Sequence, residues 1–137
     1  MNKMLLSISA ESKNESVARA CVSAFMLAAD PTVEEINDVK TAVSEAVTNS
    51  VVHAYPDGKG DIDIECFFEG EYIVVSVKDH GIGIENVERA TQPFFTTKSE
   101  EERSGLGFTV IRSFTDDLKV YSDVGGGTCV VMKKRLQ

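Results

Sequence analysis

The chain has 137 residues, of which 42% are hydrophobic, and a formal net charge of −8. This length predicts a single domain over residues 1–137 with a core of its own. The acidic balance argues against direct nucleic-acid binding, which relies on clustered Lys and Arg. No apolar run approaches the ~18 residues of a membrane span. The three distant cysteines are typical of free thiols in a reducing compartment, so we expect a cytoplasmic protein that does not bind membranes.

Hydrophobic patterning predicts the following elements in chain order. A short strand is expected at residues 4–9, followed by a helix from a capping box at Ser12 to about residue 29. A second capping box at Thr32 opens a long helix that ends near residue 54. Alternating and apolar runs predict strands at residues 62–66, 72–77, 118–121 and 128–132, with a short helix at 105–114. This order lacks strict strand–helix alternation, which favours an α+β layered sandwich.

The long predicted helix carries two different stripes. Ile36, Val39, Val43, Val47 and Ser50 share the expected core face. Glu45, Asn49 and His53 are spaced by four along another side, with Ala42 and Ala46 beside them. This second stripe could be a solvated polar face. It could also be a site in which the Asn49 oxygen binds Mg²⁺ and Glu45 accepts a proton from an attacking hydroxyl. His53 could bind phosphate or simply end the helix.

Three glycine-rich elements are candidate nucleotide contacts. The run Asp79-His80-Gly81-Ile82-Gly83 follows an apolar strand, and the Asp79 carboxylate could accept a hydrogen bond from an exocyclic amine such as that of adenine. A tight turn would have the same pattern. The run Ser104-Gly105-Leu106-Gly107 opens a predicted helix, whose N–H groups could bind phosphates, or is a flexible loop. Arg103 and Lys98 could add positive charge there. Gly125-Gly126-Gly127-Thr128 is a hairpin turn or places a hydroxyl near a base.

Taken in order, these motifs are more specific than any one of them. The run Glu45-Ala-Val-Thr-Asn49, the Asp79-x-Gly81-x-Gly83 loop, Gly105-x-Gly107 and the final Gly-Thr strand occur in that order between residues 32 and 132. The chain thereby resembles the ATP-binding domain shared by gyrase-type topoisomerases, ninety-kilodalton chaperones, histidine kinases and mismatch-repair ATPases. With its Pro93-Phe-Phe-Thr-Thr-Lys98 run and small size, it is similar to the anti-sigma-factor serine kinases of spore-forming bacilli.

The resemblance implies a two-layer α/β sandwich, with a mixed, mostly antiparallel sheet covered by helices on one face. ATP would lie under a lid at about residues 91–104. Asn49 would bind Mg²⁺, Asp79 the adenine amine, and Glu45 would be the catalytic base. Gly81, Gly83 and Thr128 would form the base end of the site, and Arg103, Gly105, Leu106 and Gly107 the phosphate end. The implied partners are a sigma factor and an anti-anti-sigma protein that is phosphorylated on serine. The chain would act as a homodimer, with Arg19 as a partner contact or merely a solvated helix residue.

Departures from the related families leave alternatives open. Histidine kinases often have Lys three positions after the metal-binding Asn, where this chain has Val52, and the role of His53 is therefore open. The chain has only His53 and His80, both within the nucleotide-site motifs, and no room for a separate acceptor-histidine domain. Two other functions stay under consideration: a binding module that uses ATP only to set its shape, and a detached histidine-kinase ATPase domain.

Overall fold

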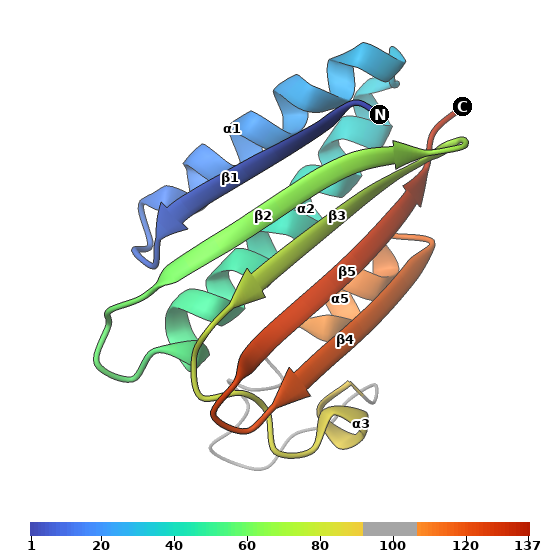
Figure 1. The fold of residues 1–137 in the computed structure, drawn as a ribbon. Coiled ribbons are helices and arrows are strands. Elements are labelled where there is room, and N and C mark those ends of the chain that lie inside the picture. The colour runs from blue at the N-terminus through green and yellow to red at the C-terminus, as the bar shows by residue number, and fades with distance from the viewer. Residues whose placement is uncertain (92–106) are drawn as a thin grey trace.

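The computed structural model describes residues 1–91 and 107–137, which form one sheet with helices on one face (Figure 1). The strand order is β1-β2-β3-β5-β4, and every pairing in the described part is antiparallel. The strands are β1 (Lys3–Ser9), β2 (Asp61–Glu69), β3 (Tyr72–Asp79), β4 (Asp117–Asp123) and β5 (Gly127–Arg135). The α+β sandwich expected from the sequence is confirmed, with a sheet that is antiparallel where a mixed one was expected.

The helices follow the predicted order, except that the short helix Val87–Ala90 (α3) was not predicted. They are α1 (Asn14–Met26) with a 3-10 turn at Leu27–Ala29, α2 (Val33–Asn49), α3 (Val87–Ala90) and α5 (Phe108–Ser113). Helix α2 lies across the middle of the sheet, between α1 and α5 (Figure 1). Among the described residues, no helix combines the length and apolar character needed to cross a bilayer.

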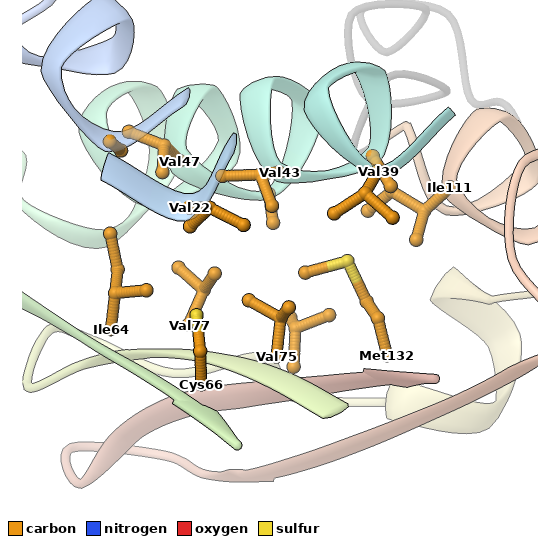
Figure 2. Packing of buried hydrophobic residues seen from close by; sticks show 14 of the residues in the cluster. Val22, Val39, Val43, Val47, Ile64, Cys66, Val75, Val77, Ile111 and Met132 are labelled. Atoms are coloured by element: carbon orange, nitrogen blue, oxygen red, sulfur yellow. The ribbon is translucent and has the colours of Figure 1, made fainter. Parts of the chain in front are cut away.

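The core forms between α1, α2 and the inner face of the sheet. Val39, Val43 and Val47 of α2 are buried, as their helical spacing predicts. They face alternate residues of β2 and β3, including Ile64 and Val75 (Figure 2). Each such side chain contributes about 1.5–3 kcal/mol on burial, so this interface holds α2 firmly over the sheet.

The two predicted capping boxes have different outcomes. At α2, the Glu35 N–H donates to Thr32 Oγ1 (3.0 Å) and the Thr32 N–H donates to Glu35 Oε1 (2.9 Å), which confirms the box. The box predicted at Ser12 is wrong, because α1 begins after Lys13 and has no side-chain cap. Ser12 lies one residue too early, and its carbonyl accepts from the Glu15 N–H (3.2 Å) instead.

The Glu35 carboxylate also fastens the end of the chain. Its second oxygen accepts from the Gln137 N–H (2.9 Å). One side chain therefore joins the start of α2 to Gln137, two residues after the end of β5. Glu35 is 7% exposed. The backbone N–H groups of Thr32 and Gln137 hold the pKa of the Glu35 carboxyl below its ordinary value of 4.5. The ionised form of Glu35 therefore stabilises the fold.

We expect Glu35→Gln to lower the free energy of unfolding at pH 7 by about 1 kcal/mol, because a charge-assisted cap becomes a neutral one. A carboxyl whose pKa is lowered by folding stabilises the fold above its unfolded pKa and loses this effect as pH falls through the folded pKa. The difference between wild type and variant should therefore shrink below about pH 4.5 in urea unfolding curves. The exposed neighbour variant Glu34→Gln is the control, and an equal loss in both variants would contradict the assignment.

Candidate functional site

The C-terminal end of α2 meets the end of β3 and the β4–β5 turn at one end of the sheet (Figure 1). Asn49 is the last residue of α2, and the chain continues as a π-helical segment, Ser50–Ala54, called here the π segment. The sequence predicted a long helix to about residue 54; the helical segment does end at Ala54, although it is π-helical rather than α-helical from Ser50 on. A π-helical turn is wider than an α-helical turn, and Asn49 and His53 still lie toward the same cavity, which both residues line.

Asp79 ends β3 and is only 4% exposed. Its Oδ2 accepts from the Ser50 hydroxyl (2.9 Å), and its Oδ1 accepts from the N–H groups of Gly81 (3.0 Å) and Thr128 (3.1 Å). A carboxylate has about four acceptor positions. These three bonds orient the group and leave one position on Oδ2 for a further donor.

The loop after Asp79 (residues 79–85, the Asp79 loop) is enclosed by backbone on two sides. A Cβ on Gly81 would lie 2.1 Å from the Ala54 carbonyl oxygen, and a Cβ on Gly83 would lie 2.1 Å from that of Asp123. Gly83 also has φ +80°, which favours glycine. Glycine is therefore required at both positions by the close approach of other backbone segments.

Two further hydroxyl groups, those of Ser122 and Thr128, lie beside the Asp79 loop. The Ser122 Oγ accepts from the Ile84 N–H (2.8 Å) and lies 2.8 Å from Thr128 Oγ1. Neither Ser50 nor Ser122 was singled out in the sequence as a site residue. Ser50 carried a signal, because a hydroxyl on a predicted core stripe needs a buried partner. Ser122 carried none, since its role depends on the register of β4 with β5.

A narrow cavity of about 30 Å³ opens between these elements. Its walls combine polar groups with an apolar side, and they comprise Ala46, Asn49, Ser50, His53, Ala54, Asp79, Gly83, Ile84, Phe108, Thr128 and Val130. That volume holds one or two water molecules, so a larger ligand enters only if lining side chains move. A wider hollow of about 720 Å³ lies around Glu35 and the C-terminus, and it shares none of the predicted site residues.

Glu45 lies one turn before Asn49 and is half-buried, but it does not line this cavity. Burial raises the pKa of the Glu45 carboxyl, and the negative charge of Glu15 on α1 raises it further. A raised pKa makes a carboxylate a better proton acceptor near neutral pH. The structure thus places Glu45 beside the cavity rather than in its wall.

Arg19 does not stand alone on α1. Its Nε lies 3.1 Å from Glu15 Oε2, one turn earlier, although its N–H is not aimed well enough to count as a hydrogen bond. The side chain is 39% exposed. Arg19 is therefore part of a surface ion pair on the helix that packs against α2.

The predicted phosphate end is described only in part. Gly107 has φ +64° and caps α5, whose first residue, Phe108, is buried against the cavity. Arg103, Gly105 and Leu106 lie outside the described residues. The same is true of the predicted lid apart from Thr91, whose carbonyl accepts from Arg112 Nη1 (3.0 Å). In the described ranges, no three His, Cys, Asp or Glu side chains gather as a metal cluster.

Comparison with known proteins identifies the family of this chain. The family described as "Histidine kinase-like ATPase domain" matches residues 8–134. The anti-sigma F factor of Clostridium kluyveri is 50% identical over 133 residues, covering 97% of this chain and 94% of that protein. The anti-sigma F factor of Thermoanaerobacter sp. (strain X514) is 53% identical over 133 residues, covering 97% of this chain and 93% of that protein.

Solved structures share the fold at low sequence identity. A Mycobacterium tuberculosis structure of RsbU and RsbW domains matches with a TM-score of 0.73 and 19% identity, over 99% of this chain and 33% of that longer chain. The catalytic domain of the histidine kinase ThkA matches with a TM-score of 0.59 and 16% identity, over 99% of this chain and 97% of that domain. With a family match across nearly its whole length and relatives at half identity, the chain belongs to the histidine kinase-like ATPase domains and, among them, to the anti-sigma F factors.

Proposed function

We propose that this chain binds ATP with Mg²⁺, phosphorylates a serine of an anti-anti-sigma protein and, in its nucleotide-bound form, binds and inhibits a sporulation sigma factor. The observation that carries the nucleotide part is Asp79, a buried carboxylate with three bonds and one acceptor position left. It shares a cavity with Asn49 and an apolar wall of Ile84, Phe108 and Val130.

The base end of this cavity has the chemistry to select adenine. The 6-amino group of adenine would donate to Asp79 Oδ2, whereas guanine would present a carbonyl oxygen and be repelled. Gly81, Gly83 and Thr128 support Asp79 or its loop, and the apolar wall offers a surface for the flat base. The cavity must widen before a purine fits.

We place the phosphate groups of ATP near Asn49, which would bind the Mg²⁺ ion that accompanies them. Mg²⁺ usually takes one or two protein ligands and completes its shell with phosphates and water, so a single amide oxygen suits it. When bound there, Mg²⁺ would neutralise charge on the phosphates. Gly105, Leu106 and Gly107 would donate backbone N–H groups, and Arg103 would add a positive charge.

In the proposed transfer, the serine oxygen of the partner attacks the γ-phosphorus while the bond from that phosphorus to the β–γ bridging oxygen breaks and ADP leaves. Glu45 accepts the serine proton. Its raised pKa suits this role.

The partners are proposed from the names of the relatives, which are anti-sigma F factors. An anti-sigma factor inhibits a sigma factor, which acts in the cytoplasm, so we place this chain there. We also propose that it forms a homodimer and does not contact nucleic acid or membranes directly. Arg19, a partly exposed residue of α1 that is ion-paired with Glu15, is the proposed partner contact.

We expect Asp79→Asn to weaken ATP–Mg²⁺ binding by about tenfold or more, because a hydrogen bond to a charged acceptor is replaced by a neutral one. GTP binding should change less than ATP binding, so the ATP-to-GTP affinity ratio should fall. Calorimetric titration with both nucleotides measures this, with Asp117→Asn on the exposed side of β4 as the control. An unchanged ATP-to-GTP affinity ratio would remove Asp79 from base recognition.

Asn49→Ala should weaken ATP binding in the presence of Mg²⁺ about tenfold, because a metal ligand is lost. In excess EDTA the variant and the wild type should bind ATP similarly. Asn37→Ala, at an exposed position of the same helix, is the matched control. Equal affinities with Mg²⁺ in wild type and Asn49→Ala would show that Asn49 does not hold the metal.

Glu45→Ala should retain ATP binding and lose phosphoryl transfer to the serine-bearing partner by about 10²-fold or more, as expected for removal of a general base. Transfer is followed with labelled ATP and the residue identified by mass spectrometry, with Glu34→Ala as the control. Unchanged transfer would refute the role of Glu45. Glu45 does not line the cavity, so ATP could bind there without Glu45 acting on it. A wild-type protein that binds ATP but transfers no phosphoryl group would support a nucleotide-gated binding module instead of a kinase.

A further inference from the structure

Tyr55 follows the π segment directly and joins two distant parts of the chain through its hydroxyl group. The oxygen accepts from the His80 N–H (2.7 Å), and the hydroxyl donates to the Asp61 carbonyl oxygen (2.6 Å). His80 comes directly after Asp79, and Asp61 begins β2. One phenol group therefore ties the first peptide of the Asp79 loop to the neighbouring strand.

The ring of Tyr55 has little freedom to move. It lies flat against Gly60, where an added Cβ would meet ring atoms at 2.2–2.5 Å. The Gly60 carbonyl is itself fixed, since it accepts from the Ala10 N–H (2.9 Å). The hydroxyl oxygen is thus presented to His80 from a rigid support.

The peptide that Tyr55 holds joins Asp79 to His80, and it is followed directly by the peptide whose N–H binds the Asp79 carboxylate. On its far side, the Gly81 N–H bonds to Asp79 Oδ1 (3.0 Å), and the Ile82 N–H bonds to the Ala54 carbonyl (2.9 Å). The His80 side chain adds a further tie, with Nε2 3.1 Å from Asp63 Oδ2. The Asp79 loop is consequently fixed at successive residues, with Tyr55 at the residue next to the carboxylate.

We propose that Tyr55 is a positioning residue for adenine selectivity, acting through the His80 peptide to hold the Asp79 carboxylate where the base must meet it. This inference rests on the proposed nucleotide function. Tyr55 does not line the cavity, so it acts without touching the base. Selectivity depends on the Tyr55–His80 hydrogen bond, because a hydrogen bond that discriminates between bases needs its acceptor held in place before the base binds.

Burial raises the pKa of the Tyr55 hydroxyl, the His80 N–H bond opposes that rise, and the negative charges of Asp79, Asp61 and Asp63 add to it. The hydroxyl therefore remains protonated at neutral pH and keeps its donor for Asp61. This supports a constant, pH-independent contact in the working range of the protein.

The test is Tyr55→Phe, which keeps the ring against Gly60 and removes only the hydroxyl. We expect ATP–Mg²⁺ affinity to fall about fivefold to tenfold and the ATP-to-GTP affinity ratio to fall with it, because net hydrogen bonds of this kind are each worth up to about a factor of ten. Tyr72→Phe makes the same chemical change at the opposite end of β3 and should leave both affinities unchanged.

A double-mutant cycle separates positioning from general stability. If Tyr55 acts through Asp79, the effect of Tyr55→Phe on the affinity ratio should disappear in the Asp79→Asn background. Hydrogen exchange of the His80 amide, followed by NMR without nucleotide, should be faster in Tyr55→Phe than in wild type or Tyr72→Phe.

The outcomes distinguish the two proposals. A wild type that binds ATP in preference to GTP, together with an unchanged ratio in Tyr55→Phe or effects that simply add in the double mutant, would overturn the role of Tyr55 alone. A wild type that binds no ATP–Mg²⁺ would overturn the proposed function, and the inference with it.

Discussion

The structure at the functional end depends on one buried charge. Asp79 is 4% exposed, and a carboxylate removed from water is costly unless donors surround it. Its three donors come from the π segment (Ser50), from its own loop (Gly81) and from β5 (Thr128). The carboxylate is therefore satisfied only when the helical layer, the end of β3 and the β4–β5 hairpin are in register. The same bonds that satisfy Asp79 build the base end of the site.

The rest of this end follows from how closely backbone segments approach. Gly81 lies against the Ala54 carbonyl, and Gly83 against that of Asp123, so the Asp79 loop is held between the π segment and the hairpin. Tyr55 fixes the remaining side through His80. Helix α2 links this end to the other proposed activity. It carries Asn49 at the cavity and Glu45 one turn away, and the charge of Glu15, the ion-pair partner of Arg19, acts on Glu45. The residues proposed for transfer and for partner contact thus lie on two helices that pack against each other.

Much of the fold could be read from periodicity, because burial of one face repeats along an element. Val39, Val43 and Val47 repeat at helical spacing, and Ile62, Ile64 and Cys66 alternate as in a half-buried strand; all are buried. Short motifs such as capping boxes predicted the structure less well, because the same residues can also occur without forming the motif. Thr32 and Glu35 form their capping box, whereas the similar run at Ser12 does not, since α1 begins after Lys13. The pairings of β1 with β2 and of β3 with β5 join distant segments, which local patterns do not encode.

The amino-acid sequence alone determined which residue types stand where nucleotide chemistry needs them: Asn49 near the end of a helix, Asp79 at the end of a strand, and glycines directly after it. These features are local, so spacing and order reveal them. Only the tertiary structure decided that Ser50 bonds to Asp79 and that Ser122 and Tyr55 bond to the loop that follows it, because these partners lie 25 or more residues away or depend on strand register. It also decided that the helix becomes π-helical after Asn49, that Asn49 and His53 line one cavity, and that Glu45 stands beside that cavity rather than in its wall.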